Sequence, residues 1–442
     1  MVGTASSVRR GWRLTGATLA ILALGGTAAC NGGVEPSWSA PAGNSAGNPT
    51  GDTPTDGGQT QPPASAAQLK LSPGADAQGV SPVDPVTAAV TDGKLDSVSL
   101  TNADNKAVPG DFDAERKSWK NSGELGYDKT YTLKVAATGA DGLRTERTQK
   151  FATVKPRNLT MPYLRANESA MLDKGTFGVG QPVIVRFDEP ITDKAAAERL
   201  LSVTTSPTDV VGGWRWMNSR EAHWRPKVYW PAGTKVTVKA TVYGKNLGNG
   251  LYGQADKTAS FTIGRSKIAI ADSKTHRMKV YVDGKLVTKI NGTDVTAGIP
   301  ISMGKGGTER SPTGNLIDFT TNSGPHVVTV KSEVYRMTSA SYGITDPKSP
   351  NFYDEKIKKS IRISGDGEFV HLRDWDTWQI GKANTSHGCI NVGTQHIFWF
   401  YDNFGAGDVV DVKGTKRQLD VGNGLGDWVL SWDEWRKGSA LS

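Results

Sequence analysis

The sequence predicts a mainly β protein, with two β-sandwich domains followed by a third β-rich domain that carries the chemistry. From about Gln68 onward, short runs of alternating apolar and polar residues recur, Gly, Pro, Asn and Asp separate them, and helical periodicity is scarce. The 442 residues carry a formal net charge of +8, with acidic and basic residues interspersed. This pattern predicts a solvated surface and no nucleic-acid partner.

Residues 1–29 are typical of an export signal. Three arginines precede the apolar run LTGATLAILALGG, which is too short to remain across a bilayer, so a retained membrane anchor is disfavoured. The run ends in GTAAC, which resembles a bacterial lipoprotein signal in which Cys30 is lipidated and becomes the new N-terminus. Thr27 stands where such signals usually have leucine, so secretion after cleavage near Ala29 is the alternative. We expect a lipid-anchored protein on the outer face of the cell membrane.

Residues 30–67 are rich in Gly, Pro, Ser, Thr and Asn, with almost nothing to bury. We expect a disordered tether. Its reach is roughly 5–6 Å times the square root of the residue count, which amounts to several tens of ångströms.

The first sandwich is expected over residues 68–155, where YTLKVAAT alternates Tyr131, Leu133 and Val135 with polar residues. The second is expected over 156–265, from the runs QPVIVRFDEPI, TKVTVKATVYG and TASFTIG. The third region begins near residue 266 with two amphipathic strands around an Asp283–Gly284 hairpin turn. Its best helix candidate is TQHIFWFYDNF, at 394–404.

Aromatic residues of the second sandwich allow two interpretations. The four tryptophans could form a sugar-stacking platform, but tryptophans in a sandwich more often belong to its core. A packed or surface role is favoured over a catalytic one for His223, which lies among aromatics. The tryptophans are Trp214, Trp216, Trp224 and Trp230.

The segment NTSHGCIN contains Cys389, one of two cysteines in the chain. If Cys30 is lipidated or removed, Cys389 has no disulfide partner in an exported protein. A thiol becomes nucleophilic when a histidine or backbone amides stabilise its anion. His387 lies two residues away, and His371 lies at a predicted strand end, from which it could return beside the cysteine loop. Gly388 would let backbone amides point at an oxyanion.

Three interpretations of this segment compete. Cys389 could be an inert buried thiol. A zinc site from His371, His387, Cys389 and His396 matches no common structural spacing and offers one thiolate. A Cys/His acyl-transfer site is favoured, so we expect no metal and no cofactor.

These residues resemble the signature of the L,D-transpeptidases, the YkuD-type enzymes that cross-link bacterial peptidoglycan. The signature consists of His371 followed by the run from Ser386 to Asn391, SHGCIN. The stretches ISMGKGG, SPTGNL, MTSASYGI, SPNFYD and GLGDWVLSWDEWRKG are similar to the actinobacterial type. The resemblance implies two immunoglobulin-like domains, a catalytic domain over 266–414 and a Trp-rich segment over 415–442 that packs on it.

The resemblance also implies roles for individual residues. Cys389 matches the nucleophile, His371 the general base and acid, and His387 with Gly388 the turn that shapes the oxyanion region. Leu372 follows the base where relatives often have serine, and it can substitute if only its backbone carbonyl orients the imidazole. The positions implied to contact substrate are Ser386, Asn391, Tyr353, Asp366, Gly367, Met337, Tyr342 and Trp375.

The partners implied are donor and acceptor stem peptides of peptidoglycan, with carbapenem-type β-lactams as inhibitors. The donor would lose its terminal D-alanine and form a thioester with Cys389. An acceptor amine resolves that thioester in a transpeptidase, and water resolves it in an L,D-carboxypeptidase. A non-enzymatic wall-binding protein is the third alternative, and it predicts no role for Cys389.

Overall fold

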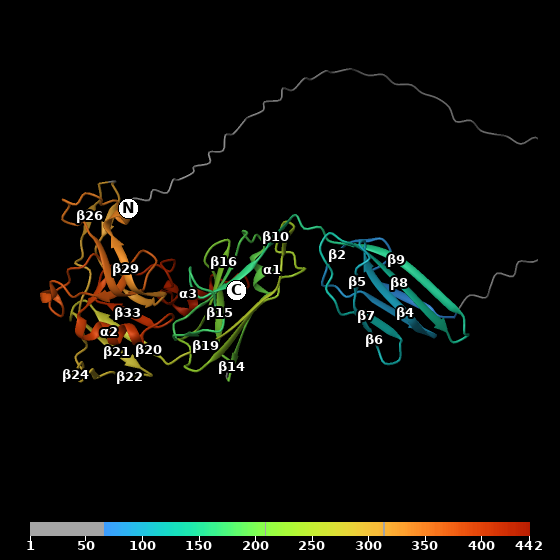
Figure 1. Cartoon of the computed structure of the whole chain (residues 1–442), viewed down its shortest axis with the longest axis horizontal. Helices are drawn as coiled ribbons and strands as arrows, with labels where there is room; N and C mark the ends of the chain where they lie inside the picture. Colours follow the sequence, from blue (N-terminus) through green and yellow to red (C-terminus); the bar gives the residue numbers. More distant parts are fainter. Residues whose placement is uncertain (1–65, 208, 313) are drawn as a thin grey trace, which may run out of the picture. The chain divides into compact units, whose positions relative to one another are not determined.

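The computed structural model describes residues 66–442, except 208 and 313 (Figure 1). The predicted export signal, Cys30 and nearly all of the predicted tether lie outside this range. The described residues belong to one compact unit, Pro63–Ser442. They form 33 strands and three short α-helices, which confirms the mainly β class. The helices are α1 (Lys194–Glu198), α2 (Thr394–Asn403) and α3 (Trp432–Arg436). Within this part of the chain, no helix is long and apolar enough to cross a membrane.

The first sandwich packs two sheets around one core. Tyr131, Leu133 and Val135 are all buried in it, as their alternation predicts, together with Trp119. One sheet has the order β1 (Gln68–Ser72), β3 (Thr87–Thr91), β7 (Ser118–Asn121) and β6 (Gly110–Phe112). The other has the order β2 (Ala77–Val80), β9 (Arg144–Thr153), β8 (Thr130–Gly139), β4 (Gly93–Asn102) and β5 (Ala107–Val108).

The second sandwich has two sheets of four strands each. One has the order β11 (Pro162–Arg165), β13 (Val183–Phe187), β16 (Glu221–Pro226) and β15 (Gly212–Trp216). The other has the order β12 (Thr176–Phe177), β19 (Lys257–Ile263), β17 (Lys235–Ala240) and β14 (Leu201–Ser206). A small sheet pairs β10 (Asn158–Thr160) with β18 (Leu251–Gly253).

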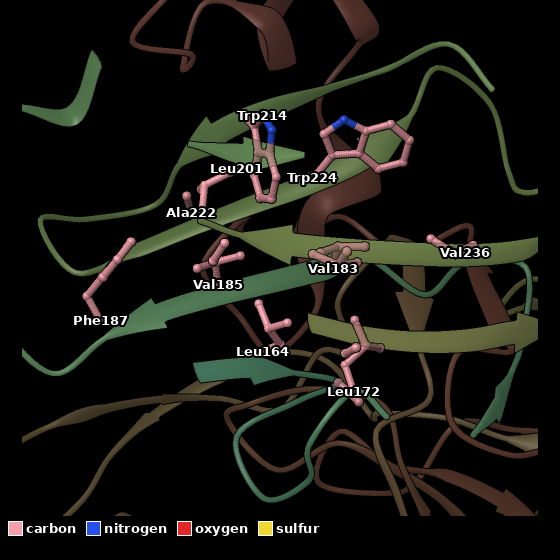
Figure 2. Packing of buried hydrophobic residues seen from close by; sticks show 14 of the residues in the cluster. Leu164, Leu172, Val183, Val185, Phe187, Leu201, Trp214, Ala222, Trp224 and Val236 are labelled. Atoms are coloured by element: carbon pink, nitrogen blue, oxygen red, sulfur yellow. The ribbon is translucent and has the colours of Figure 1, made fainter. Parts of the chain in front are cut away.

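Tryptophans fill much of the second core. Figure 2 shows Trp214 and Trp224 in the same cluster as Leu164, Val183 and Val185. All four tryptophans of the sequence pattern are at most 8 % exposed. They are therefore core residues and do not form an open stacking platform.

The third region is built on a ten-stranded sheet. Its order is β28 (Gly324–Val327), β33 (Val409–Lys413), β20 (Lys267–Asp272), β21 (Arg277–Val282), β25 (Ile299–Ser302), β32 (Ile390–Val392), β31 (Phe369–Leu372), β30 (Asp354–Arg362) and β29 (Val330–Thr338). Strand β22 (Lys285–Leu286) pairs with β21 through the predicted turn, in which Asp283 and Gly284 have φ of 49° and 76°. A second turn, at 273–276, separates β20 from β21. Helix α2 confirms the helix expected after the cysteine.

Two hairpins and a short helix lie outside this order. The hairpins pair β23 (Lys289–Ile290) with β24 (Thr293–Asp294) and β26 (Thr308–Arg310) with β27 (Leu316–Asp318). The 3₁₀ helix η1 (Ser339–Tyr342) follows β29 and leads into the loop before β30.

The C-terminal segment, residues 415–442, contacts both the second sandwich and the sheet of the third region. The Trp435 indole N–H donates to the Gly213 carbonyl at 2.9 Å. On the other side, the Leu419 amide donates to the Ser323 carbonyl at 2.9 Å. The sequence predicted that this segment packs on the catalytic domain. The structure adds a contact with the second sandwich.

Buried His223, on β16, connects the second sandwich to the C-terminal segment. Its Nδ1 lies 2.7 Å from the Asp427 carboxylate and its Nε2 lies 3.1 Å from that of Glu221. Burial acts to lower the His223 pKa, but the two carboxylates outweigh it and raise the pKa to about 9. His223 is therefore a packed residue, as favoured from the sequence, and its charged ring links the second sandwich to Asp427 of the C-terminal segment.

Candidate active site

Two neighbouring strands bring the histidine and the cysteine of the sequence pattern together. Strand β31 runs parallel to β32, and His371 on β31 is the cross-strand neighbour of Asn391 on β32. Cys389 immediately precedes β32, two residues before Asn391. Both strands are buried along their whole length, as expected for apolar central strands. His371 and Cys389 therefore lie diagonally across one ladder.

Side-chain hydroxyls hold the turn from Ser386 to Cys389. Ser386 Oγ donates to the Cys389 carbonyl at 2.6 Å and accepts from the Gly388 amide at 3.1 Å. Thr321 Oγ1 donates to the Gly388 carbonyl at 2.7 Å. Gly388 has φ of 135°, a conformation that residues with a Cβ rarely adopt. The glycine is therefore required by the backbone, and its amide already has an acceptor.

Most of the predicted site residues line one cavity of about 310 Å³. They come from β29, the η1 region, the loop before β31 and the Ser386–Cys389 turn. The predicted residues in this lining are Met337, Tyr342, Tyr353, Asp366, Gly367, His387, Gly388 and Cys389.

Aromatic rings cover the turn. The ring centroids of Tyr353 and His387 lie 5.1 Å apart. The ring of Phe319 contacts the His387 ring edge to face, with 5.2 Å between centroids. The side chains of Tyr342 and Tyr353 both line the cavity beside this turn. Burial raises the pKa of Tyr342 to about 12, and burial also raises that of Tyr353. Both phenols are therefore neutral hydrogen-bond donors at neutral pH.

The Cys389 thiol is half-buried, and its sulfur lies 3.9 Å from the Gly367 carbonyl. Burial raises the pKa of this thiol to about 12, and the nearby carboxylates of Glu368 and Asp366 add to the effect. The resting site therefore holds a protonated sulfur.

His371 is a neutral imidazole with a defined tautomer. Its Nδ1 lies 2.8 Å from the Leu372 carbonyl, an acceptor, so Nδ1 carries the proton and Nε2 keeps its lone pair. Burial lowers the His371 pKa to about 4. The contact uses the backbone of Leu372, so the side chain that departs from the family pattern takes no part in it. Among the described residues, no hydrogen bond joins His371 to Cys389.

Four predicted site residues do not line this cavity of about 310 Å³, which we call the Cys389 cavity. Asn391 is 1 % exposed, and its Oδ1 finds no hydrogen-bond partner in the part of the chain described. Ser386 is buried beneath the turn that it holds. Trp375 lines a separate surface cavity of about 360 Å³ beside Leu372 and Asp374. His371 is buried and is not part of the lining of this Cys389 cavity.

Four residues near Cys389 were not predicted from the sequence: Glu368, His326, Thr321 and Arg417. Glu368 is buried beside the turn, where it accepts from the Asn322 amide at 2.7 Å and contacts buried His326 Nε2 at 3.1 Å. A charged residue next to the apolar run FVHL, and a histidine in the apolar run PHVVTV, were the available signals. Thr321 and Arg417, which also lie near the turn, had no comparable signal.

The alternative zinc interpretation finds no support in the arrangement. Within residues 66–442, apart from the two omitted positions, no three His, Cys, Asp or Glu side chains form a group that could hold a metal ion. His396, the fourth ligand considered, is buried on α2.

Comparisons with known proteins agree along most of the chain. Residues 77–246 match the bacterial Ig domain, and residues 266–412 match the L,D-transpeptidase catalytic domain. L,D-transpeptidase 2 of Mycobacterium tuberculosis is 38 % identical over 365 residues, which are 82 % of this chain and 83 % of that protein. L,D-transpeptidase 5 of the same species is 35 % identical over 385 residues, 86 % of this chain and 78 % of that protein.

Among solved structures, that of LdtMt1 in complex with imipenem is 27 % identical, with a TM-score of 0.44, and covers 57 % of this chain and 99 % of its own. The sequence relatives, which are more than 30 % identical over more than two thirds of their length, establish the family. The chain belongs to the L,D-transpeptidases and is an enzyme of peptidoglycan cross-linking, with a bacterial Ig region before a YkuD catalytic domain.

Proposed function

We propose that Cys389 is the nucleophile of this transpeptidase and that His371 moves its proton. The observation that carries the proposal is the neutral His371, which the Leu372 carbonyl fixes in the tautomer with a free Nε2 on the strand beside the cysteine. A base needs a lone pair that is available and correctly oriented. The protonated thiol on the cavity wall supplies the matching acid.

In the first half of the reaction, Cys389 Sγ attacks the carbonyl carbon of the third residue of the donor stem peptide. His371 Nε2 takes the thiol proton as the C–S bond forms. The carbon–nitrogen bond then breaks, the departing D-alanine nitrogen takes the proton from His371, and a thioester remains.

In the second half, an acceptor amine attacks the thioester carbon. His371 Nε2 takes a proton from the attacking nitrogen and returns it to the sulfur as the C–S bond breaks. The turn at His387 and Gly388 would shape the oxyanion region. Because the Gly388 amide donates to Ser386, the neutral hydroxyls of Tyr342 and Tyr353 are the further donors that we assign to it.

An L,D-carboxypeptidase would use the same thiol and imidazole, with water in place of the amine. The substrate-contacting roles of Met337, Asp366 and Gly367 are part of the proposal because their side chains or backbone line the Cys389 cavity. Those of Ser386, Asn391 and Trp375 require the substrate to reach beyond this cavity or the site to open.

We further propose that the enzyme works in the cell wall from a lipid anchor on Cys30, and that carbapenems acylate Cys389. The anchor rests on the sequence pattern. Acylation rests on the family resemblance and on the chemistry of a strained cyclic amide, whose carbonyl offers the thiol the same electrophile as the donor peptide.

Intact-protein mass spectrometry with a disaccharide tetrapeptide tests the nucleophile. We expect a thioester adduct on the wild-type protein, none on Cys389→Ser, and cross-linked dimer as the main product. A Cys389→Ser variant that folds and still forms dimer would end the assignment. Tripeptide without dimer would identify a carboxypeptidase.

A further inference from the structure

A second cavity adjoins the one that Cys389 lines. Its volume is about 130 Å³, which suits an amino-acid-sized group better than a whole stem peptide. The two cavities share Tyr342, Asp366, Glu368, His387 and Gly388 in their linings. The smaller cavity therefore shares the Ser386–Cys389 turn with the Cys389 cavity, through His387 and Gly388.

Opposite charges meet on the wall of this smaller cavity. The Asp366 carboxylate lies 3.3 Å from the guanidinium of Arg417, which belongs to the C-terminal segment. The two side chains are 37 % and 40 % exposed, so a ligand can reach both. Burial acts to raise the Asp366 pKa, but hydrogen bonds from Ser364 and Asn423, together with Arg417, hold it below its usual value. The site thus offers a fixed negative and a fixed positive group.

Two other arginines, Arg336 and Arg362, line the Cys389 cavity, and both already have partners. The Arg336 guanidinium donates to both carboxylate oxygens of Asp354 at 2.7 Å. The Arg362 Nε donates to the Ser364 carbonyl at 2.9 Å and its Nη2 to the Gly365 carbonyl at 2.6 Å. Among the described residues, the Arg417 side chain hydrogen-bonds only to Asp366. Arg417 is the guanidinium in the lining of the smaller cavity, and most of its donors remain for a ligand.

We propose that Asp366 and Arg417 form a subsite for an α-amino-acid group, a nitrogen whose neighbouring carbon carries a carboxylate. Arg417 would bind the carboxylate and Asp366 the nitrogen in its charged form. The inference rests on the proposed function and assigns the subsite to the group that leaves the donor and to the group that replaces it. Both nitrogens bond to the same carbonyl carbon beside the same sulfur, so they occupy one place in turn.

The proton balance is consistent with this arrangement. An arriving ammonium gives one proton to solvent before it attacks, because only the neutral amine has a lone pair. Its second proton passes to His371 and then to the sulfur as the thioester bond breaks. Asp366 attracts and positions the nitrogen, and Arg417 positions the carboxylate, so both are binding residues for this step.

The test uses the full-length protein and two matched pairs of ligands. The donors are a stem tetrapeptide that ends in D-alanine and the same peptide that ends in D-alaninamide, followed as thioester formation by intact-protein mass. The acceptors are free D-alanine and D-alaninamide, followed as capture of the thioester. The variants are Arg417→Gln and Asp366→Asn, with Arg436→Gln as the control from the same C-terminal segment.

We expect the wild-type protein to prefer the carboxylate over the amide in both pairs. Arg417→Gln should lower kcat/KM for the carboxylate ligands roughly 10- to 100-fold, the cost of one charge-assisted hydrogen bond, and should leave the amide ligands unchanged. Asp366→Asn should weaken both acceptors alike, since each presents an ammonium. Arg436→Gln should match the wild type.

Two results would overturn the subsite. One is a wild-type protein that treats acid and amide equally, and the other is an Arg417→Gln variant that loses both in the same proportion, as a structural role would cause. Circular dichroism of each variant checks that it is folded, and Arg417→Lys, which keeps the charge, should recover part of the preference. Retained turnover in Cys389→Ser would instead refute the proposed function, so the two failures are distinguishable.

Discussion

The Cys389 thiol of the resting enzyme should react with iodoacetamide far more slowly than the same thiol in the unfolded chain. Only the thiolate reacts, and burial raises the pKa of Cys389 to about 12. At pH 7 such a thiol is ionised to about one part in 10⁵, whereas an exposed cysteine with a pKa near 8.5 is ionised to about 3 %. The fraction of thiolate therefore differs by roughly 10³-fold, and the greater nucleophilicity of the high-pKa thiolate offsets only part of this difference in rate.

The assay compares the protein in buffer with the protein in urea. A Cys30→Ala background leaves Cys389 as the single thiol, so the mass gain reports one site. In the folded protein the rate should rise about tenfold per pH unit from pH 6 to pH 10 without reaching a plateau, because the whole range lies below the thiol pKa. In urea the rate should level off above about pH 9.

A folded protein that reacts as fast as the unfolded chain, with a plateau below pH 7, would refute this reasoning. That profile belongs to a preformed thiolate paired with a protonated imidazole. A second arm separates the partners, because His371→Ala would abolish such a plateau if His371 were the cation. If the thiol is neutral as described, His371→Ala should leave iodoacetamide reactivity almost unchanged and should slow acylation by donor peptide strongly.

Three further predictions concern other parts of the chain. Leu372→Ser should lower stability by roughly 2–4 kcal/mol, because it empties a buried site, yet keep the rate of carbapenem acylation, because the carbonyl that holds His371 remains; a large loss of rate would show that the side chain matters. The His223 contact, whose pKa is raised, should be fully stabilising below about pH 6.5 and should be lost as pH rises through about 9, a change of roughly 3 kcal/mol in urea unfolding that His223→Gln should not show. Cys30→Ala should move the protein from the membrane fraction to the soluble fraction with activity on soluble muropeptides intact, and continued membrane binding would contradict the lipid anchor.

Local patterns made the fold readable from the sequence. Alternation in YTLKVAAT predicted which side chains of β8 are buried, and Asp283–Gly284 predicted a tight turn because both positions need positive φ. The paired sheets and the helix after the cysteine followed from the same signals. The turn that separates β20 from β21 was missed because the apolar residues on both sides continue the strand pattern.

The site was predictable only where residues lie close in sequence or match the family signature. The signature gave His371 and the run from Ser386 to Asn391, and the parallel pairing of β31 with β32 explains why they meet. Thr321 and Arg417 reach the turn from distant segments, and no local pattern marks them. Glu368 stands out as a charge next to the apolar run FVHL, but its partners Asn322 and His326 lie in another segment. The burial of Cys389 could not be predicted from the sequence either. Its raised pKa, and hence its protonated resting state, follows from the three-dimensional packing.

The C-terminal segment contacts both the second sandwich and the catalytic sheet, and this affects the order in which the chain folds. Trp428 donates to the Gly180 carbonyl at 2.7 Å, and the Arg225 guanidinium lies over the rings of Trp428 and Trp435, each 4.7 Å away. This segment is synthesised after every residue that it contacts. With the predicted export signal in use, the sandwich and the catalytic sheet would therefore reach the far side of the membrane before the residues that connect them. Arg417 belongs to this same segment, so a chain stalled or cleaved before it would lack one wall of the smaller cavity even with Cys389 in place.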